Sequence, residues 1–409
     1  MNRWYAAILL AAVAGTAVAQ SNSATGPAPT GRSGPASAPR RMPMRVIDTP
    51  YYTLHTDVSD AEARETDLRM TRMFEEYQRR TAGFAGTVRQ KFPFFLFRSE
   101  RDYHAAGGPQ GSAGVFIREP EGKRLMAIAG EKTDAETWHT VQHEGFHQFA
   151  DASIANPLPA WANEGLADYF GEAVWTGDNF VTGLIPTPRM KAVQNSIRTG
   201  GFKPFKVLMN LSYKDWNGDL STENYDEGWS MIHFLANADG GKYQAPFLQY
   251  MQQISHGITT DNAWANVFGR DIDGFQARYA AYWTSMQDGP TRAGYVKAVV
   301  LTETSFLARA YLLKQTPKDA ASFFKEYKPP EYGVNRDLWL PPELFTEYAE
   351  VVEALGKWTI TPAAAGTLPK LVLQTEEGAT LTGTFTVING KVGKVEITVA
   401  QVATRPGGK

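Results

Sequence analysis

Residues 143–149 read HEGFHQF, and the spacing within this heptapeptide predicts both a helix and a metal site. On a helix, residues four apart lie on one face, so His143 and His147 can direct their imidazoles at one point. Glu144 lies one step around the same helix, where its carboxylate can act as a general base. A catalytic zinc takes three protein ligands and leaves its fourth position to water, so one further His, Asp or Glu is required nearby.

The sequence around the heptapeptide predicts two helices that supply the third ligand. Thr133 and Glu136 have the spacing of a capping box, which predicts the first helix over about 134–152. LPAWANEGLADYF follows, and its proline, Pro159, suits the first turn of another helix. Glu164 on that second helix lies 17 residues after His147. A short turn between two antiparallel helices would bring its carboxylate back to the histidines.

Asp168 follows Glu164 by four residues and lies on the same face of the predicted second helix. Imidazoles that bind a metal normally donate their other N–H to an acceptor, which holds the ring and fixes its tautomer. Asp168 is placed to accept this hydrogen bond from His143. The sequence thus predicts Zn²⁺ ligands at His143, His147 and Glu164, with Asp168 as the hydrogen-bond acceptor for His143.

HEGFH followed by PAWANEGLADYF resembles the gluzincin metallopeptidases, in which two helices supply His-Glu-x-x-His and a downstream glutamate with an acidic residue four positions later. The likeness extends to YDEGWSMIHFL, which is similar to the Tyr-x-x-Gly helix start of aminopeptidase-type gluzincins. Tyr225 matches the tyrosine whose hydroxyl stabilises the oxyanion in that family. Residues 45–290 are also similar to a family of bacterial exported proteins described as peptidase-MA-like.

The resemblance implies an exported zinc metallopeptidase that hydrolyses a peptide or protein substrate. A zinc-activated water would attack the scissile carbonyl, while Glu144 would accept its proton and pass it to the leaving amine. Tyr225 would stabilise the oxyanion, and an edge strand near 124–129 would pair with the extended substrate, as in gluzincins. The Gly-x-Met-x-Asn signature of aminopeptidases does not precede the zinc helix, so the likeness does not extend to amino-terminal specificity.

Upstream of the zinc helices, apolar alternation predicts a β-rich start to the folded chain near residue 45. A helix is expected over 59–81, a strand over 92–97, and two short strands over 114–117 and 124–130. Strands followed by helices indicate an α+β fold, here with a mixed N-terminal sheet and a helical zinc subdomain of the gluzincin type.

Composition and pattern divide the chain into five segments. A charged residue followed by an apolar run and then small residues predicts a signal peptide at the start of the chain. The Ser-, Gly- and Pro-rich sequence after it predicts a disordered linker. The five are a signal peptide over 1–19, a disordered linker over 20–44, a peptidase-like domain over 45–290, a helical segment over 291–356 and a small β-rich unit over 357–409.

Two further helices, near 224–237 and 275–287, should complete the peptidase-like domain. In the C-terminal unit, apolar and polar residues alternate as in a strand with one buried face, and Asn389-Gly390 predicts a hairpin turn. Aromatic side chains of the zinc helices are expected to pack in the core rather than to bind a ligand. They are Trp138, Phe146, Phe149, Trp161, Tyr169 and Phe170.

The formal net charge of -2 provides no electrostatic excess for nucleic acid or an anionic membrane surface. The chain has no cysteine, which excludes disulfides, thiol catalysis and cysteine-bound zinc. Any metal must therefore be held by histidines and carboxylates. The signal peptide predicts export to a bacterial periplasm or the extracellular space, without stable membrane insertion after cleavage.

Two further histidines, one acidic segment and a rival function were also considered from the sequence. His139 lies one turn before His143, but a fourth histidine would fill the position that hydrolysis needs, so a structural or exposed role is expected. His233 is expected to be a hydrogen-bonded core histidine. Residues 215–226 resemble a calcium loop, but Leu220 replaces the required glycine, so a surface loop is expected. The rival function is a non-catalytic envelope binding or scaffold protein with a structural zinc helix pair.

Overall fold

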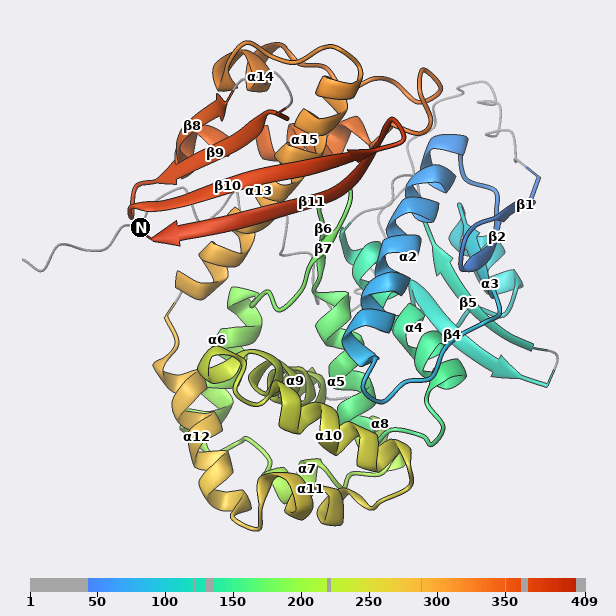
Figure 1. Ribbon diagram of the computed structural model, residues 1–409. Coiled ribbons are helices and arrows are strands. Elements are labelled where there is room, and N and C mark those ends of the chain that lie inside the picture. Colours follow the sequence, from blue (N-terminus) through green and yellow to red (C-terminus); the bar gives the residue numbers. More distant parts are fainter. Residues whose placement is uncertain are drawn as a thin grey trace, which may run out of the picture.

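The computed structural model describes residues 43–120, 122–129, 135–218, 222–287, 289–349, 351–361 and 367–401. The predicted signal peptide, nearly all of the predicted linker and the expected capping residue Thr133 lie outside these residues. Within them the architecture is mixed α+β, as predicted. The first five strands form one sheet, the middle of the chain is helical, and the last four strands form a second sheet (Figure 1).

A five-stranded mixed sheet forms the N-terminal part, with order β1-β2-β3-β5-β4. Its strands are β1 (Arg45–Asp48), β2 (Tyr52–Thr56), β3 (Phe92–Phe97), β4 (Gly114–Glu119) and β5 (Gly122–Ile128). The expected edge strand near 124–129 is wrong, because β5 pairs with β3 on one side and β4 on the other. The middle of β5 is buried on both faces, which suits an interior strand. The edge strand on this side of the sheet is therefore β4.

Helices cover both faces of this sheet. α2 (Asp60–Thr81) and α4 (Ala135–Ser153) pack on one face, and the short α3 (Glu100–Ala105) packs on the other. α2 begins at a capping box, in which Ser59 accepts from the Glu62 N–H and the Glu62 carboxylate accepts from the Ser59 N–H. Both long helices confirm the predicted ranges within one residue. α4, which carries HEGFHQF, is thereby fixed against the sheet.

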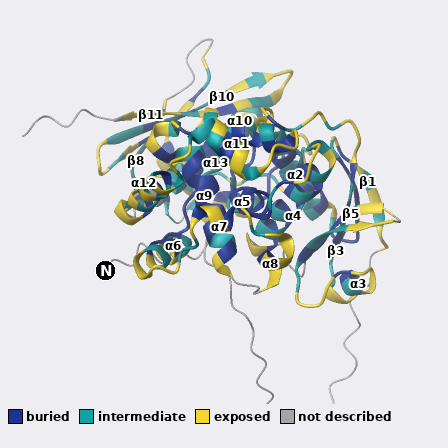
Figure 2. Ribbon diagram, turned by 90° about the horizontal axis from the view of Figure 1, so that it is seen from below, coloured by how far each residue is buried: buried dark blue, intermediate teal, exposed yellow. Residues whose placement is uncertain are grey.

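Three helices meet at the centre of the molecule, where most residues are buried (Figure 2). α5 (Ala160–Gly171) packs between α4 and α9 (Thr222–Gly241), and every residue of α5 is buried. Glycine is required where α5 crosses α9, because a Cβ atom on Gly165 would lie 2.5 Å from the Gly228 carbonyl oxygen. The six aromatic side chains expected in this core are all buried: Trp138, Phe146, Phe149, Trp161, Tyr169 and Phe170.

Shorter elements complete the helical part. They are β6 (Val174–Trp175), β7 (Phe180–Val181), α6 (Thr187–Thr199), α7 (Phe205–Leu208), α8 (Tyr213–Gly218), α10 (Gln244–Ser255), α11 (Thr260–Phe268) and α12 (Ile272–Ser285). α9 and α12 confirm the helices predicted near 224–237 and 275–287. The surface loop expected over 215–226 is wrong for its described residues, which are helical on both sides of 219–221. The Asn224 side chain links α9 to α8 by donating a hydrogen bond to the Trp216 carbonyl oxygen at 3.0 Å.

The C-terminal part is a four-stranded antiparallel sheet packed on a long helix. Its elements are α13 (Gly289–Leu312), α14 (Ala320–Glu326), α15 (Pro342–Ala349), α16 (Val352–Leu355), β8 (Gly356–Thr361), β9 (Lys370–Thr375), β10 (Ala379–Ile388) and β11 (Lys391–Gln401). Asn389 and Gly390 join β10 to β11 with φ values of 51° and 76°. The predicted hairpin is thus confirmed, because both residues adopt the positive φ that such a turn requires.

A buried ion pair ties α13 to the helical part. Arg309 donates to both carboxylate oxygens of Asp178, at 2.7 and 3.0 Å, and the two side chains are 6% and 7% exposed. The largest hydrophobic core draws its residues from Tyr52 to Trp283, whereas the cores around α13 lie almost wholly beyond Val296. The expected boundaries near 290 and 356 remain predictions.

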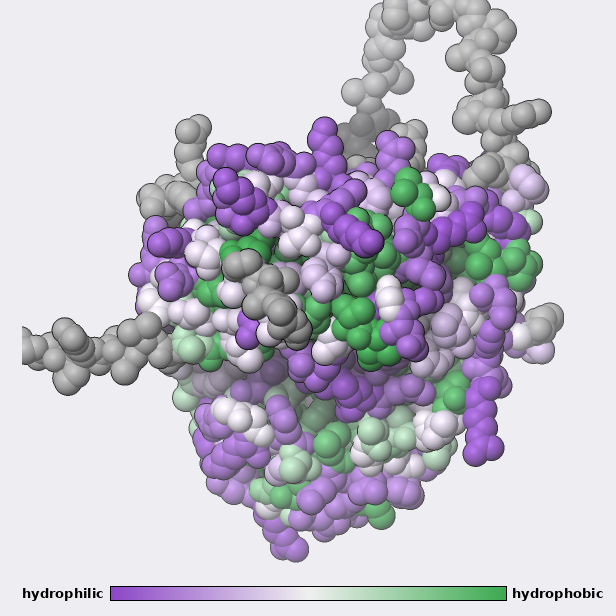
Figure 3. Space-filling model, turned by 45° about the horizontal axis from the view of Figure 1, so that its top comes forward, coloured by the Kyte–Doolittle hydropathy of each residue, from purple (hydrophilic) through white to green (hydrophobic). Residues whose placement is uncertain are grey.

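Among the described residues, no helix is both long enough and apolar enough to cross a membrane. The face of the molecule in Figure 3 is largely hydrophilic, and its apolar residues occur in small separate areas. The most exposed large apolar side chains, Val46, Val334 and Ile388, come from three distant parts of the chain. Isolated residues of this kind are normal on protein surfaces.

Glu303, in the middle of α13, is fully buried, and neither of its carboxylate oxygens has a hydrogen-bond partner among the described residues. Burial raises the pKa of Glu303 well above its ordinary value of 4.5. The folded chain therefore holds this proton more tightly than the unfolded chain. Its contribution to stability is complete below pH 4.5 and is lost as the pH rises toward the folded-state pKa.

The substitution Glu303→Gln removes this titration and keeps the size of the side chain. We expect the stability of the wild type to fall relative to that of the variant as pH rises above 4.5, by about 1.4 kcal/mol per pH unit until the folded-state pKa is passed. Thermal unfolding followed by circular dichroism over a pH series measures the difference. Glu353→Gln, at an exposed position of α16, should follow the wild type. Parallel curves for Glu303→Gln and wild type would contradict the expectation.

Candidate metal centre

The two histidines of HEGFHQF face a glutamate of the neighbouring helix. His143 and His147 project from one face of α4, and their Nε2 atoms lie 3.1 Å apart. Oε2 of Glu164, on α5, lies 3.4 Å from His143 Nε2 and 3.2 Å from His147 Nε2. The structure therefore brings the three predicted ligands to one point.

This triangle of donor atoms has the dimensions of three ligands around one zinc ion. Zinc binds imidazole nitrogen and carboxylate oxygen at about 2.0–2.1 Å, and tetrahedral geometry then separates the ligand atoms by about 3.3 Å. The observed separations of 3.1, 3.2 and 3.4 Å bracket that value. Among the described residues, this group of possible ligands has three members, His143, His147 and Glu164. Three ligands leave a fourth position for water or substrate.

The protonation of the three side chains suits a cation. Burial alone would raise the pKa of Glu164, but hydrogen bonds to His143 and His147 lower it to about 2. Burial would likewise lower the pKa of His143, but hydrogen bonds to Asp168 and Glu164 raise it well above its ordinary value. The site without a metal thus holds a carboxylate next to a protonated imidazole. A divalent cation can take the place of that proton.

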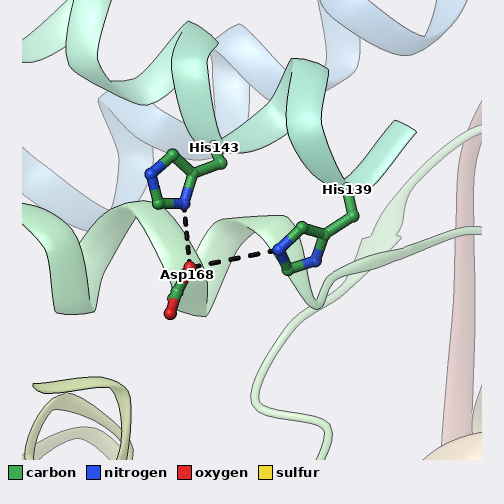
Figure 4. A group of neighbouring side chains, drawn as sticks. All are labelled: His139, His143 and Asp168. Carbon is green, nitrogen blue, oxygen red and sulfur yellow. Dashed lines mark hydrogen bonds and ion pairs between the residues drawn. The ribbon is translucent and has the colours of Figure 1, made fainter. Parts of the chain in front are cut away.

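Asp168 holds the ring of His143 from behind, one helical turn after Glu164. Its Oδ1 lies 2.8 Å from Nδ1 of His143 (Figure 4). Because Nδ1 is engaged in this bond, Nε2 of the same ring is directed at Glu164 and His147. The structure thus brings together His143 and the acceptor that the sequence assigns to it.

Asn163 is the corresponding partner of His147, and sequence reasoning missed it. The side-chain amide of Asn163 lies 3.0 Å from Nδ1 of His147. When Nε2 of His147 binds a metal, Nδ1 carries the proton, so the amide must present its oxygen to the ring. One signal could have identified Asn163: it is a polar residue within the otherwise apolar AWANEGLADYFG, and buried polar groups need partners.

Arg189, on α6, joins three carboxylates of two other helices. Its guanidinium donates to Asp168, to Glu172 at 2.9 Å and to Asp226 at 2.8 Å. It also lies over the ring of Trp229, 5.0 Å from the centroid. No sequence pattern marks this arginine, because Asp168 and Asp226 are 21 and 37 residues away in the chain.

The charge of Arg189 keeps Asp168 ionised. Burial alone would raise the pKa of Asp168, but Arg189 and then His143 hold it well below its usual range. Asp168 is therefore a permanent acceptor for the His143 ring. Arg189 also connects α5 to Asp226, the residue after Tyr225 on α9.

Glu144, next to the predicted ligand His143 on α4, contacts the free edge of the N-terminal sheet. Its Oε2 accepts a hydrogen bond from the Phe116 N–H of β4, at 2.8 Å. In an antiparallel pair, successive residues turn their N–H and C=O alternately toward the partner strand and away from it. The bond to Glu144 shows that Phe116 turns its backbone N–H away from β5.

Two tyrosines border the same space, Tyr225 near the start of α9 and Tyr213 at the start of α8. The ring centroids of Tyr225 and His143 lie 6.5 Å apart. Burial and then the charge of Glu164 raise the pKa of each tyrosine to about 12. Both phenols are therefore neutral hydrogen-bond donors at neutral pH. Tyr225 is at the site as expected, whereas no motif indicated Tyr213.

The two other histidines considered from the sequence are not part of the ligand triangle. His139, also drawn in Figure 4, lies 4.0 Å from Asp168 and 3.9 Å from Glu172, and its side chain is 36% exposed. His233 is 2% exposed and lies 3.1 Å from the Gly183 carbonyl oxygen. Burial lowers the pKa of His233 to about 4. The structure thus places His233 in the core, as expected.

The substitution Arg189→Met would leave three carboxylates without their shared cation. Removing one partner of a buried ion pair commonly costs about 3–5 kcal/mol, so we expect a loss of that order in the free energy of unfolding by urea. Arg198→Met, at an exposed position of the same helix, is the matched control and should change it by less than about 0.5 kcal/mol. Equal losses for the two variants would contradict the assigned role.

Comparison with known proteins gives a family without an assigned activity. Residues 137–259 match a family described as a protein of unknown function, DUF1570. The matched segment contains the three possible ligands together with Asp168 and Tyr225. No curated protein matches the chain.

Proposed function

We propose that this chain is a zinc metallopeptidase of the gluzincin type that hydrolyses peptide bonds. The observation that carries the proposal is the convergence of His143, His147 and Glu164 at separations that suit three ligands of one zinc ion, on the helix that also carries Glu144. The family matched by residues 137–259 has no stated activity and does not conflict with this assignment. Export to a bacterial periplasm or the extracellular space is part of the proposal, and rests on the signal peptide predicted from the sequence.

The side chains of the site divide the steps of hydrolysis among them. Bound zinc supplies the Lewis acidity that activates water near neutral pH. Glu144 accepts the proton of the attacking water and returns it to the leaving amine. Tyr225 donates a hydrogen bond from its neutral phenol to the oxyanion of the tetrahedral intermediate. Asp168 and Asn163 keep the two imidazoles in the orientation that a metal needs.

The free edge of β4 binds the peptide substrate in this proposal. An extended peptide can add to an exposed strand edge through main-chain hydrogen bonds. Gly114, Phe116 and Arg118 occupy alternate positions of β4, so the three share one orientation of their backbone groups. Phe116 is in contact with Glu144, so a peptide on this edge passes the general base. Pairing with the substrate is thus assigned to β4 instead of to the 124–129 segment, which lies in the interior strand β5.

The rival function, a scaffold in which zinc only stabilises the helix pair, requires a closed metal site. Structural zinc has four protein ligands. The described residues supply three at this point. A base and two phenols around the open position favour catalysis over a purely structural site.

The first test separates metal binding from turnover. Glu144→Gln should retain one zinc per chain and lose peptide hydrolysis by a factor of about 10² to 10⁴, since it keeps the ligands and removes the base. Glu164→Gln should lose zinc affinity, because it removes a ligand charge. Zinc content is measured by elemental analysis and turnover by mass spectrometry of a peptide library. Glu136→Gln, at an exposed position of α4, is the control. Full activity of Glu144→Gln would refute the proposed base.

The second test concerns the oxyanion. Tyr225→Phe keeps the aromatic contact with Trp216, 5.6 Å between centroids, and removes only the donor. We expect kcat to fall by about 10² to 10³ with zinc content unchanged. Tyr282→Phe, on α12, is a matched control for the loss of a hydroxyl. A change in KM alone, with kcat preserved, would contradict a transition-state role for Tyr225.

A further inference from the structure

Two residues of β4 contact α4 at successive positions, so the strand and the helix run side by side in the same direction. Phe116 bonds Glu144 at 2.8 Å, and two residues later Arg118 lies 3.1 Å from Asp151, two helical turns beyond Glu144. Arg118 has the same backbone orientation as Phe116, because it occupies the next alternate position of the strand. Its side chain lies on the face of the sheet that α4 covers.

Arg118 is the surplus cation of a three-membered charge cluster. Asp151 receives a hydrogen bond from Lys123 at 2.6 Å through Oδ2 and contacts Arg118 at 3.1 Å through Oδ1. The side chain of Asp151 is 15% exposed, whereas that of Arg118 is 57% exposed. Arg118 can therefore turn to another anion while Lys123 keeps Asp151 paired. The next carboxylate of β4, Glu119, has its own partner in Arg124 at 2.9 Å.

Strand spacing places Arg118 about 6.6 Å along β4 from Phe116, whose N–H donates to Glu144. Burial and Glu164 raise the pKa of Tyr213 to about 12, and the positive charge of Arg118 opposes that rise. The charges of Glu164 and Arg118 therefore both act on Tyr213. It is also 42% exposed, so the space that it borders is open to solvent. A peptide on the edge of β4 reaches Arg118 in this same space.

Strand geometry determines which part of a substrate meets Arg118. Antiparallel pairing is the more stable arrangement, so a peptide on β4 should run opposite to it. Residues opposite Arg118 then precede those opposite Phe116, at the general base. Two residues of strand span about 6.6 Å, so the meeting point lies about two or three residues before the scissile bond.

We propose that Arg118 selects a substrate with an acidic side chain two or three residues before the scissile bond. Residues directly opposite each other in an antiparallel pair have their side chains on one face, about 4.5–5.5 Å apart at Cβ, and opposite charges there attract. A lysine or arginine at the same substrate position is disfavoured by like charge. This inference rests on the proposed peptidase function and assigns its substrate class.

The test is cleavage-site profiling with the zinc-loaded full-length protein and peptides that differ only by Glu, Gln or Lys at one position. The wild type should cleave the Glu peptide about fivefold better than the Gln peptide, as the ratio of kcat/KM, at the second or third position before the scissile bond. Arg118→Gln should bring this ratio to about one, and Arg118→Glu should favour Lys over Gln. Arg124→Gln, on β5, is the control that should keep the wild-type ratio.

A second variant changes the ratio in the opposite direction. Asp151→Asn frees Arg118 from its present partner and should raise the preference for Glu, whereas a general loss of fold would lower cleavage of both peptides equally. The ratio should also fall as salt rises, because exposed charge pairs are screened.

The outcomes separate this inference from the function on which it rests. Cleavage with equal rates for the Glu and Gln peptides, or a Glu preference that Arg118→Gln leaves unchanged, overturns the inference and leaves the peptidase in place. The absence of any cleavage by protein that has bound one zinc per chain overturns the proposed function, and the inference with it.

Discussion

Three polar side chains buried in one apolar helix constrain the surrounding structure. Asn163, Glu164 and Asp168 are 8%, 9% and 3% exposed within α5. A buried polar group without a partner costs about 1–3 kcal/mol, and a buried charge costs more. Each of the three therefore needs a partner from another helix, and α4 provides two histidines for them. The same contacts that satisfy α5 bring the two imidazoles and the carboxylate together.

Charge compensation extends this constraint to a third and a fourth helix. Asp168 carries a permanent negative charge, and Arg189 of α6 supplies the cation that makes its burial tolerable. The same guanidinium reaches Asp226 of α9, next to Tyr225. Packing agrees with this arrangement, because Gly165 and Gly228 allow α5 and α9 to approach closely. Ligands, their hydrogen-bond partners and the tyrosine are thus held by one connected set of contacts.

The order of strands in the N-terminal sheet places the edge strand β4 next to Glu144. β5 carries the buried apolar run and takes the interior position, which leaves the less buried β4 at the edge. A free edge next to Glu144 is the feature that relates the proposed metal site to the proposed peptide substrate. Helix α13, on which the C-terminal sheet packs, is joined to the same helical part through Arg309 and Asp178.

Local periodicity accounts for the features that can be predicted from the sequence. His143 and His147 lie four apart on one helix and Glu164 follows after a short connection, so helical spacing predicts their meeting; the hairpin at Asn389-Gly390 is local in the same way. The edge position of β4 and the contacts of Arg189 with Asp168 and of Asn163 with His147 depend on the fold of the whole chain. Those contacts join distant segments, and their choice is made by burial and charge compensation across the whole core, which no short pattern records.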